Sequence, residues 1–98
     1  MPAKKIKIEI EVDEIWTLNA DAENRAYYRV WKVNDYEVEA TIEKKRHHWK
    51  CHIKWGYVTS ERKIGQCLYF DKMFDAMAEM NAIAKNKVKE HVARLAVV

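Results

Sequence analysis

The sequence predicts an α+β domain, an antiparallel meander sheet of four or five strands with one long C-terminal helix packed on one face. Two patterns support this fold class. From residue 36 to residue 57, apolar and polar side chains alternate with the period of half-buried strands. From residue 72 onward, apolar residues recur at helical spacing, and the stretch contains no glycine or proline. The 98 residues are enough for a single domain, 1–98, with its own core.

The first predicted strand covers residues 3–12, where isoleucine and valine alternate with lysine and glutamate. Its charged outer face suits the edge of a sheet. The alternation is interrupted at Asp13 and Glu14, and Trp16 and Leu18 resume it. Either a bulge or a long bent strand is therefore predicted. The polar residues 19–25 read as a loop within the domain.

A tight hairpin joins the next two strands, because Asn34 and Asp35 tolerate the positive φ of a two-residue turn. Extending the pairing from this turn places Arg29 on the inner face opposite Ala40, where an unpaired charge would be costly. In one interpretation the strand lies near an edge, and the side chain either reaches past the core or pairs with an acidic residue such as Asp75. In the other, it projects into a cleft and binds an anion. The inward pairs would be Val33 with Tyr36, Trp31 with Val38, and Tyr27 with Ile42.

A second hairpin is predicted with its turn centred on Lys45 and Arg46. Each glutamate of residues 36–43 then faces a basic or potentially basic residue of the following strand. A slip of one residue would turn the whole apolar set toward water, so pattern and charge together predict a single register. The inward pairs would be Ile42 with Trp49, Ala40 with Cys51, Val38 with Ile53 and Tyr36 with Trp55; the outward pairs would be Glu43 with His48, Thr41 with Lys50, Glu39 with His52 and Glu37 with Lys54.

Residues 64–70 form the last predicted strand, with Ile64, Leu68 and Phe70 inward and Gln66 as a polar exception. Asp71 is the expected N-cap of a helix of about 24 residues. This helix would cover the apolar face of the sheet with one stripe of side chains. The stripe consists of Met73, Ala76, Met77, Met80, Ile83, Ala84, Val88, Val92 and Leu95.

Composition sets broad limits on function. With 49% hydrophobic and 34% charged residues, the chain is globular, and its net charge of +3 permits an acidic partner without requiring one. Cys51 is expected in the core and Cys67 on the outer face, which disfavours a disulfide and favours a reduced, cytoplasmic protein. No signal peptide or membrane-spanning run is recognisable, so no membrane partner is expected.

The basic and aromatic run from Lys44 to Tyr57 suggests a noncatalytic module that binds nucleic acid through turns and loops. The tryptophans of this run point into the predicted core and leave the cations to make the contact. Whether the two basic loops converge depends on the strand order. The candidate nucleic-acid-binding residues are Lys44, Lys45, Arg46, His48, Lys50, Arg62 and Lys63.

An alternative function is a compact inhibitor or adaptor, of the kind that a phage or mobile element encodes, which occupies a surface of a larger host protein. Its contact residues would be the apolar side chains expected outside the core, namely Tyr28, Val30, Tyr69 and Phe74. A homodimer through an exposed strand edge is a further possible assembly.

The sequence contains no pattern typical of an enzyme, a metal site or a cofactor site. It has no glycine-rich phosphate loop, no nucleophile elbow, and no cysteine with a convincing base. On a strand, His48 and His52 would lie about 13 Å apart, too far to share one zinc ion. We therefore expect no catalytic residues, no metal and no cofactor.

One set of residues between positions 27 and 87 matches the motif of a known family. The matching residues are Tyr27, Tyr28, Arg29 and Val30, then Trp49, then Trp55, Gly56 and Val58, then Gly65 and Gln66, and finally Phe70, Ala78 and Lys87. With these residues the chain resembles WGR domains, the small sheet-plus-helix modules found with poly(ADP-ribose) polymerases. The resemblance implies binding near DNA ends. Tyr57 stands where the family has the arginine of its name, so no functional residue is carried over.

Overall fold

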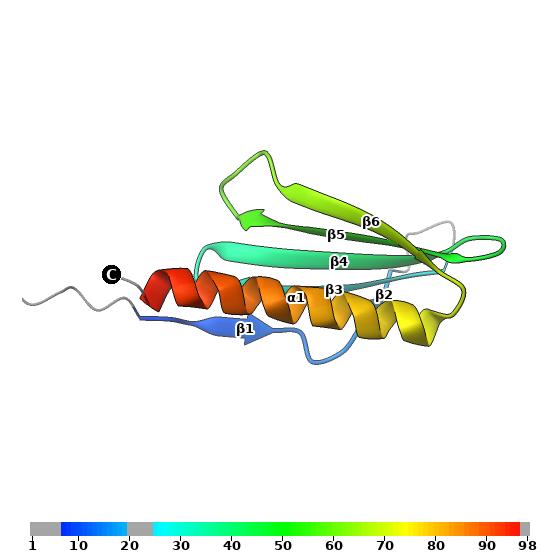
Figure 1. Ribbon diagram of the computed structural model, residues 1–98, viewed down its shortest axis with the longest axis horizontal. Helices are drawn as coiled ribbons and strands as arrows, with labels where there is room; N and C mark the ends of the chain where they lie inside the picture. Colours follow the sequence, from blue (N-terminus) through cyan, green and yellow to red (C-terminus); the bar gives the residue numbers. More distant parts are fainter. Residues whose placement is uncertain (1–6, 20–24, 97–98) are drawn as a thin grey trace, which may run out of the picture.

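The computed structural model describes residues 7–19 and 25–96. Within these residues, one antiparallel sheet has the order β1-β3-β4-β5-β6, and β2 pairs with β3 at the same edge as β1 (Figure 1). The predicted α+β meander with one C-terminal helix is confirmed. The elements are β1 Ile10–Val12, β2 Thr17–Leu18, β3 Ala26–Val33, β4 Tyr36–Lys44, β5 Trp49–Tyr57, β6 Ile64–Phe70 and α1 Met73–Ala96.

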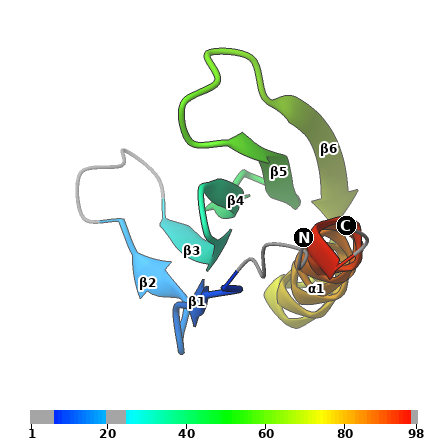
Figure 2. The same cartoon turned by 90° about the vertical axis from the view of Figure 1, so that its left-hand side faces the viewer.

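The sheet curls around α1, which lies along its inner face (Figure 2). The helix contacts β3, β4, β5 and β6. The core joins the inward side chains of the central strands to one stripe of the helix, and burial of these apolar groups drives the two layers together. Its fully buried members include Val38, Ile42, Ile53, Ala76 and Met80.

The β3–β4 hairpin has the predicted register. Val33 pairs with Tyr36, Trp31 with Val38, and Tyr27 with Ile42. Asn34 adopts a φ of 52°, as expected at a two-residue turn. Its side-chain oxygen also accepts a hydrogen bond of 2.7 Å from the Glu9 N–H, which ties the turn to the segment before β1.

The predicted register of the β4–β5 hairpin is wrong by two residues, although the predicted faces are correct. Ile42 pairs with Cys51 and Tyr36 with Tyr57, because residues 45–48 all belong to the connection. The Lys45 N–H donates to the His48 carbonyl across this connection, at 2.8 Å. A shift of two keeps every side chain on its face, so alternation alone cannot exclude it.

The N-terminal edge is shorter and more exposed than predicted. The strand begins at Ile10, while residues 3–6 of the predicted strand lie outside the described residues. The chain leaves the sheet after Val12 and resumes pairing at Thr17, so the predicted irregularity separates two strands. Ile10 and Val12 are exposed because α1 does not extend over this edge.

The helix has the predicted length of 24 residues but begins one residue later than expected. Its first backbone bond runs from the Ala76 N–H to the Lys72 carbonyl, at 3.1 Å, so Lys72 and not Asp71 occupies the N-cap position. The buried residues Ala76, Met80 and Ala84 confirm the predicted stripe. His91, absent from that stripe, is buried with them.

Candidate functional site

The two predicted basic loops lie at opposite ends of the sheet. The β4–β5 connection carries Lys45, Arg46 and His48, and residues 58–63 between β5 and β6 carry Arg62 and Lys63. Figure 1 shows the two connections at opposite ends of β5, whose nine residues span about 30 Å. The predicted nucleic-acid-binding residues therefore do not form one surface.

At the β4–β5 end, neighbouring side chains engage several of the predicted cations. The Lys45 ammonium lies 2.9 Å from a Glu43 carboxylate oxygen, and the Lys44 ammonium lies 5.1 Å from the centre of the Trp49 ring. His48 contacts Tyr69 edge to face, at 5.2 Å between ring centres. Arg46 is exposed. This end therefore offers a small basic tip with part of its charge already balanced.

Lys50 lies on the outer face of the sheet, where it lines a cavity. That cavity has a volume of about 630 Å³. It holds one lysine, one glutamate and one histidine among small or neutral residues, so its charge is mixed. Its lining residues are Asn19, Ala26, Thr41, Glu43, Lys50, His52 and Cys67.

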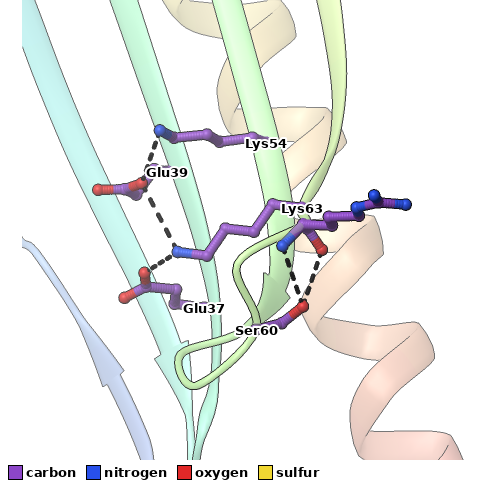
Figure 3. A network of polar contacts seen from close by, with 6 residues as sticks. Glu37, Glu39, Lys54, Ser60 and Lys63 are labelled. Atoms are coloured by element: carbon purple, nitrogen blue, oxygen red, sulfur yellow. Dashed lines mark hydrogen bonds and ion pairs between the residues drawn. The ribbon is translucent and has the colours of Figure 1, made fainter.

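Lys63 takes part in an ion-pair network within the fold (Figure 3). Its ammonium pairs with Glu37 and lies 3.9 Å from Glu39, which also forms an ion pair with Lys54 at 3.6 Å. The stem of Lys63 crosses Gly56, where a Cβ would lie only 3.1 Å from the lysine Cγ. Lys63 thus fastens the β5–β6 loop to β4, and its charge is balanced by glutamate.

A cleft opens beside this loop, between the ends of β4 and β5 and the C-terminal half of α1. Its volume is about 510 Å³. Three cations and one carboxylate surround an aromatic wall. We call it the aromatic–cationic cleft, and its lining residues are Tyr36, Trp55, Gly56, Tyr57, Ser60, Arg62, Ile64, Lys87, Glu90 and Arg94.

The cations of the cleft lie close to its aromatic rings. The Lys87 ammonium lies 4.4 Å from the centre of the Trp55 ring, and the Arg94 guanidinium lies 5.9 Å from that of Tyr36. Lys87 also pairs with Glu90 at 3.6 Å, so one cation is partly neutralised. The negative ring faces attract these cations and hold them near the aromatic wall.

The loop that closes the cleft is held by a short polar turn. The Ser60 hydroxyl donates to the Arg62 carbonyl at 2.9 Å and accepts from the Arg62 N–H at 3.3 Å (Figure 3). This turn fixes the backbone of Arg62, while no residue of the described chain pairs with its guanidinium. Tyr57 lies on the inward face, as its alternation predicted, and contacts Tyr36 and His91, but 49% of its surface is exposed at the open end of the cleft.

His91 lies beneath the rings of the cleft and is only 1% exposed. Its imidazole stacks on Tyr36 at 4.0 Å and meets Tyr57 edge to face at 5.6 Å. Neither ring nitrogen has a hydrogen-bond partner among the described residues. Burial lowers the pKa of His91, the Arg94 charge lowers it further, and Asp35 opposes both. Burial also raises the pKa of the Tyr36 hydroxyl, against the effect of Arg94.

Sequence reasoning missed the helical side of this cleft. Lys87, Glu90 and Arg94 follow one another at spacings of three and four, which places them on one face of a helix. His91 lies between them, at the border of the apolar stripe. A charged helix face beside a histidine at the border of the apolar stripe could have indicated a site on the helix. Only the strand order shows that Trp55 and Arg62 lie opposite this face.

The predicted protein-binding residues are also divided between surfaces. Tyr28, Val30 and Tyr69 point outward from the sheet, and Tyr28 and Tyr69 are three strand spacings apart, about 14 Å. Phe74 is 81% exposed on the first turn of α1, in the other layer of the fold. A side-chain hydrogen bond with Cys67 raises the pKa of the Tyr69 hydroxyl.

Arg29 reaches past the core, as one of its predicted alternatives has it, and its partners are neutral groups instead of Asp75. Its Nε donates to the Asp13 carbonyl at 2.8 Å, and one terminal nitrogen donates to the Asn81 amide oxygen at 3.1 Å. The guanidinium also lies 5.1 Å from the Trp31 ring centre. Arg29 therefore joins the β1–β2 connection to the helix.

Other features of the described residues limit the chemistry. Cys51 and Cys67 are free thiols on opposite faces, as their alternation predicted, and burial raises the pKa of Cys51 to about 11, with a smaller contribution from Cys67. In residues 7–19 and 25–96, no cluster of three His, Cys, Asp or Glu side chains could hold a metal ion. The described helix is not apolar enough to cross a bilayer.

Comparison of the chain with protein-family models, curated proteins and solved structures gives no match. The resemblance to WGR domains therefore stays a prediction.

Proposed function

We propose that this protein is a noncatalytic module that binds single-stranded nucleic acid in the aromatic–cationic cleft. The observation that carries the proposal is the meeting of Arg62, Lys87 and Arg94 with the rings of Tyr36, Trp55 and Tyr57 in one opening. Sites for single strands combine cations that hold the backbone with rings on which bases stack.

Charge and ring exposure support a role for each part. Arg62 and Arg94 are exposed, and each can contact a phosphate, while Lys87 already stands over Trp55. Tyr57 is the most accessible ring of the cleft and offers a stacking surface. Glu90 opposes phosphate and limits the net attraction.

The cleft favours a single strand over a duplex. A base can enter an opening of about 510 Å³ and stack on a tyrosine only when its faces are not covered by neighbouring base pairs. Phosphates alone would bind both forms by charge. The preference for single strands is thus the distinguishing feature of a site built on aromatic rings.

The experiment is a fluorescence-anisotropy titration with labelled single- and double-stranded DNA and RNA. If three phosphates are contacted, raising the salt from about 50 to about 200 mM should weaken single-strand binding about 20-fold. The variant Arg62→Gln with Arg94→Gln should lose at least tenfold in affinity and reduce the salt dependence.

The matched control removes two charges at the other end of the sheet, by Lys45→Gln with Arg46→Gln. It should change the affinity by less than about threefold. A larger loss in the control than in the cleft variant would move the interface to the β4–β5 tip. The absence of binding at low salt, or equal binding of duplex and single strand, would overturn the proposal.

The second candidate is the inhibitor or adaptor that binds a larger host protein. The exposed Tyr28 and Tyr69 of the outer face favour it, because exposed aromatic side chains are frequent in protein interfaces. Binding of such a partner should tolerate both charge variants and fail with Tyr28→Ser plus Tyr69→Ser. The two free thiols support a reducing compartment such as the cytoplasm for either function.

A further inference from the structure

The last strand of the sheet has one unpaired edge. β6 pairs with β5 along its whole length, from Trp49 with Phe70 to Trp55 with Ile64. No described strand pairs with its other side (Figure 1). Such an edge presents a row of backbone donors and acceptors to which a further strand can add.

The sequence of β6 lacks the usual protection of an edge strand. Its seven residues, IGQCLYF, include no charged residue and no proline. The opposite edge of the sheet is different, because β1 and β2 are short. Lys7 and Glu9 precede β1, and Glu11 lies within it. Charges and short strands discourage pairing there, whereas β6 is long and uncharged.

The β6 sequence is complementary to itself in an antiparallel arrangement. If two copies pair around Cys67, Ile64 meets Phe70 on the inner face, and Gly65 meets Tyr69 on the outer face. Gln66 then meets Leu68 on the inner face, which is the one polar–apolar pair of this register. Ile64 is 67% exposed and Tyr69 60% exposed, so both have apolar surface to bury. An aromatic ring beside a β-branched residue and a ring over glycine are both favourable cross-strand neighbours.

We infer that the free edge of β6 binds a second copy of this chain. The two β6 strands run antiparallel around a two-fold axis at Cys67, which joins the two sheets into one. At such an axis, a charged residue would lie opposite the same residue of the second copy and repel it. The uncharged β6 avoids this repulsion. Since a single pair of strands is a small interface, the dissociation constant should be about micromolar. This inference does not depend on the binding of nucleic acid.

The first test is the oligomeric state of the full chain by analytical ultracentrifugation under reducing conditions. We expect a dimer at about 100 μM and dissociation on dilution below about 1 μM. Cys67→Glu places two carboxylates opposite each other at the axis and should weaken the dimer at least tenfold. Cys67→Lys should do the same, and an equimolar mixture of the two variants should restore it.

The matched control is His52→Glu, which puts the same charge on the neighbouring strand, directly beside Cys67 in the sheet. It should leave the dimer intact. A wild-type chain that stays monomeric at about 100 μM, or a Cys67→Glu variant that dimerises like the wild type, would overturn the inference.

A second measurement needs no charged variant. The exposed Cys67 thiols of two paired β6 strands would lie within disulfide range, because Cα atoms directly opposite in antiparallel strands are about 4.5 to 5.5 Å apart. Mild oxidation of the wild-type chain should give a covalent dimer, and Cys67→Ser should give none. Pairing with an extended peptide in place of a second copy would leave the chain monomeric in both measurements.

Discussion

At the scale of single residues, His91 is the most unusual group in the fold. It lies within the apolar interface of helix and sheet, stacked on Tyr36, and neither ring nitrogen has a described partner. Burial favours the neutral imidazole over the imidazolium cation, because the charged form loses more hydration free energy. The residue therefore links the stability of the fold to pH.

The first prediction concerns the pH dependence of stability. Because the folded state lowers the pKa of His91 below its usual value near 6.5, the unfolded chain binds its proton more readily. Above about pH 6.5, His91 is neutral in both the folded and the unfolded chain and costs no stability. As the pH falls from there toward the folded-state pKa, the unfolded chain takes up the proton first, and the folded state loses stability. Urea unfolding between about pH 7.5 and pH 5 should show the loss.

The variant His91→Phe keeps an aromatic ring on Tyr36 and removes the titration, so its stability should fall less over the same range. The exposed His47 provides the control, and His47→Gln should retain the wild-type pH profile. A His91→Phe profile identical to that of the wild type would assign the pH dependence to other groups.

At the scale of elements, the second prediction concerns the attachment of the β5–β6 loop to β4. Lys63 and Glu37 are both largely shielded from water, and Lys54 and Glu39 form a more exposed pair on the same sheet face. A double-mutant cycle with Lys63→Met and Glu37→Gln should give a coupling energy of about 1–3 kcal/mol in urea unfolding.

The corresponding cycle with Lys54→Met and Glu39→Gln should give less than about 1 kcal/mol, because solvent screens an exposed pair. Equal coupling in the two cycles would show that shielding of Lys63 does not strengthen its ion pair. Since the loop carries Arg62, Lys63→Met should also weaken single-strand binding in the cleft.

The elements also show which parts of the fold the sequence can predict. Alternation identified the inward face of β4 and β5, because a one-residue slip would expose Val38, Ile42 and Ile53 together. It could not separate the observed register from one shifted by two, since both bury the same residues. The length of the 45–48 connection decides between them, and basic residues in a loop carry little information about its length.

At the scale of the whole molecule, the candidate site depends on strand order. Arg62 was among the predicted nucleic-acid contacts, but its neighbours in the cleft, Lys87 and Arg94, come from the C-terminal half of α1. The same strand order separates Arg62 from Lys45 and Arg46. Local patterns specify each element, whereas the position of the last strand and the path of the helix decide which loops meet.

The third prediction follows from the dependence of the cleft on the helix. Met80 is fully buried between α1 and the sheet, so Met80→Ala should cost about 2–5 kcal/mol in urea unfolding. This is a large part of the roughly 5–15 kcal/mol that holds a domain of this kind together. Phe74 lies six residues before Met80 on the same helix but is exposed. Phe74→Ala should therefore change the stability by less than about 0.5 kcal/mol.

Binding in the cleft should follow folding in these variants. Because Lys87 and Arg94 reach the cleft only when α1 is packed on the sheet, Met80→Ala should lower the amount of binding-competent protein near its unfolding midpoint and leave the affinity of the folded fraction unchanged. Anisotropy titrations at several urea concentrations, compared with circular dichroism, separate the two quantities. Strong single-strand binding by the unfolded Met80→Ala chain would instead mean that unstructured lysine and arginine side chains suffice and that the cleft is not the site.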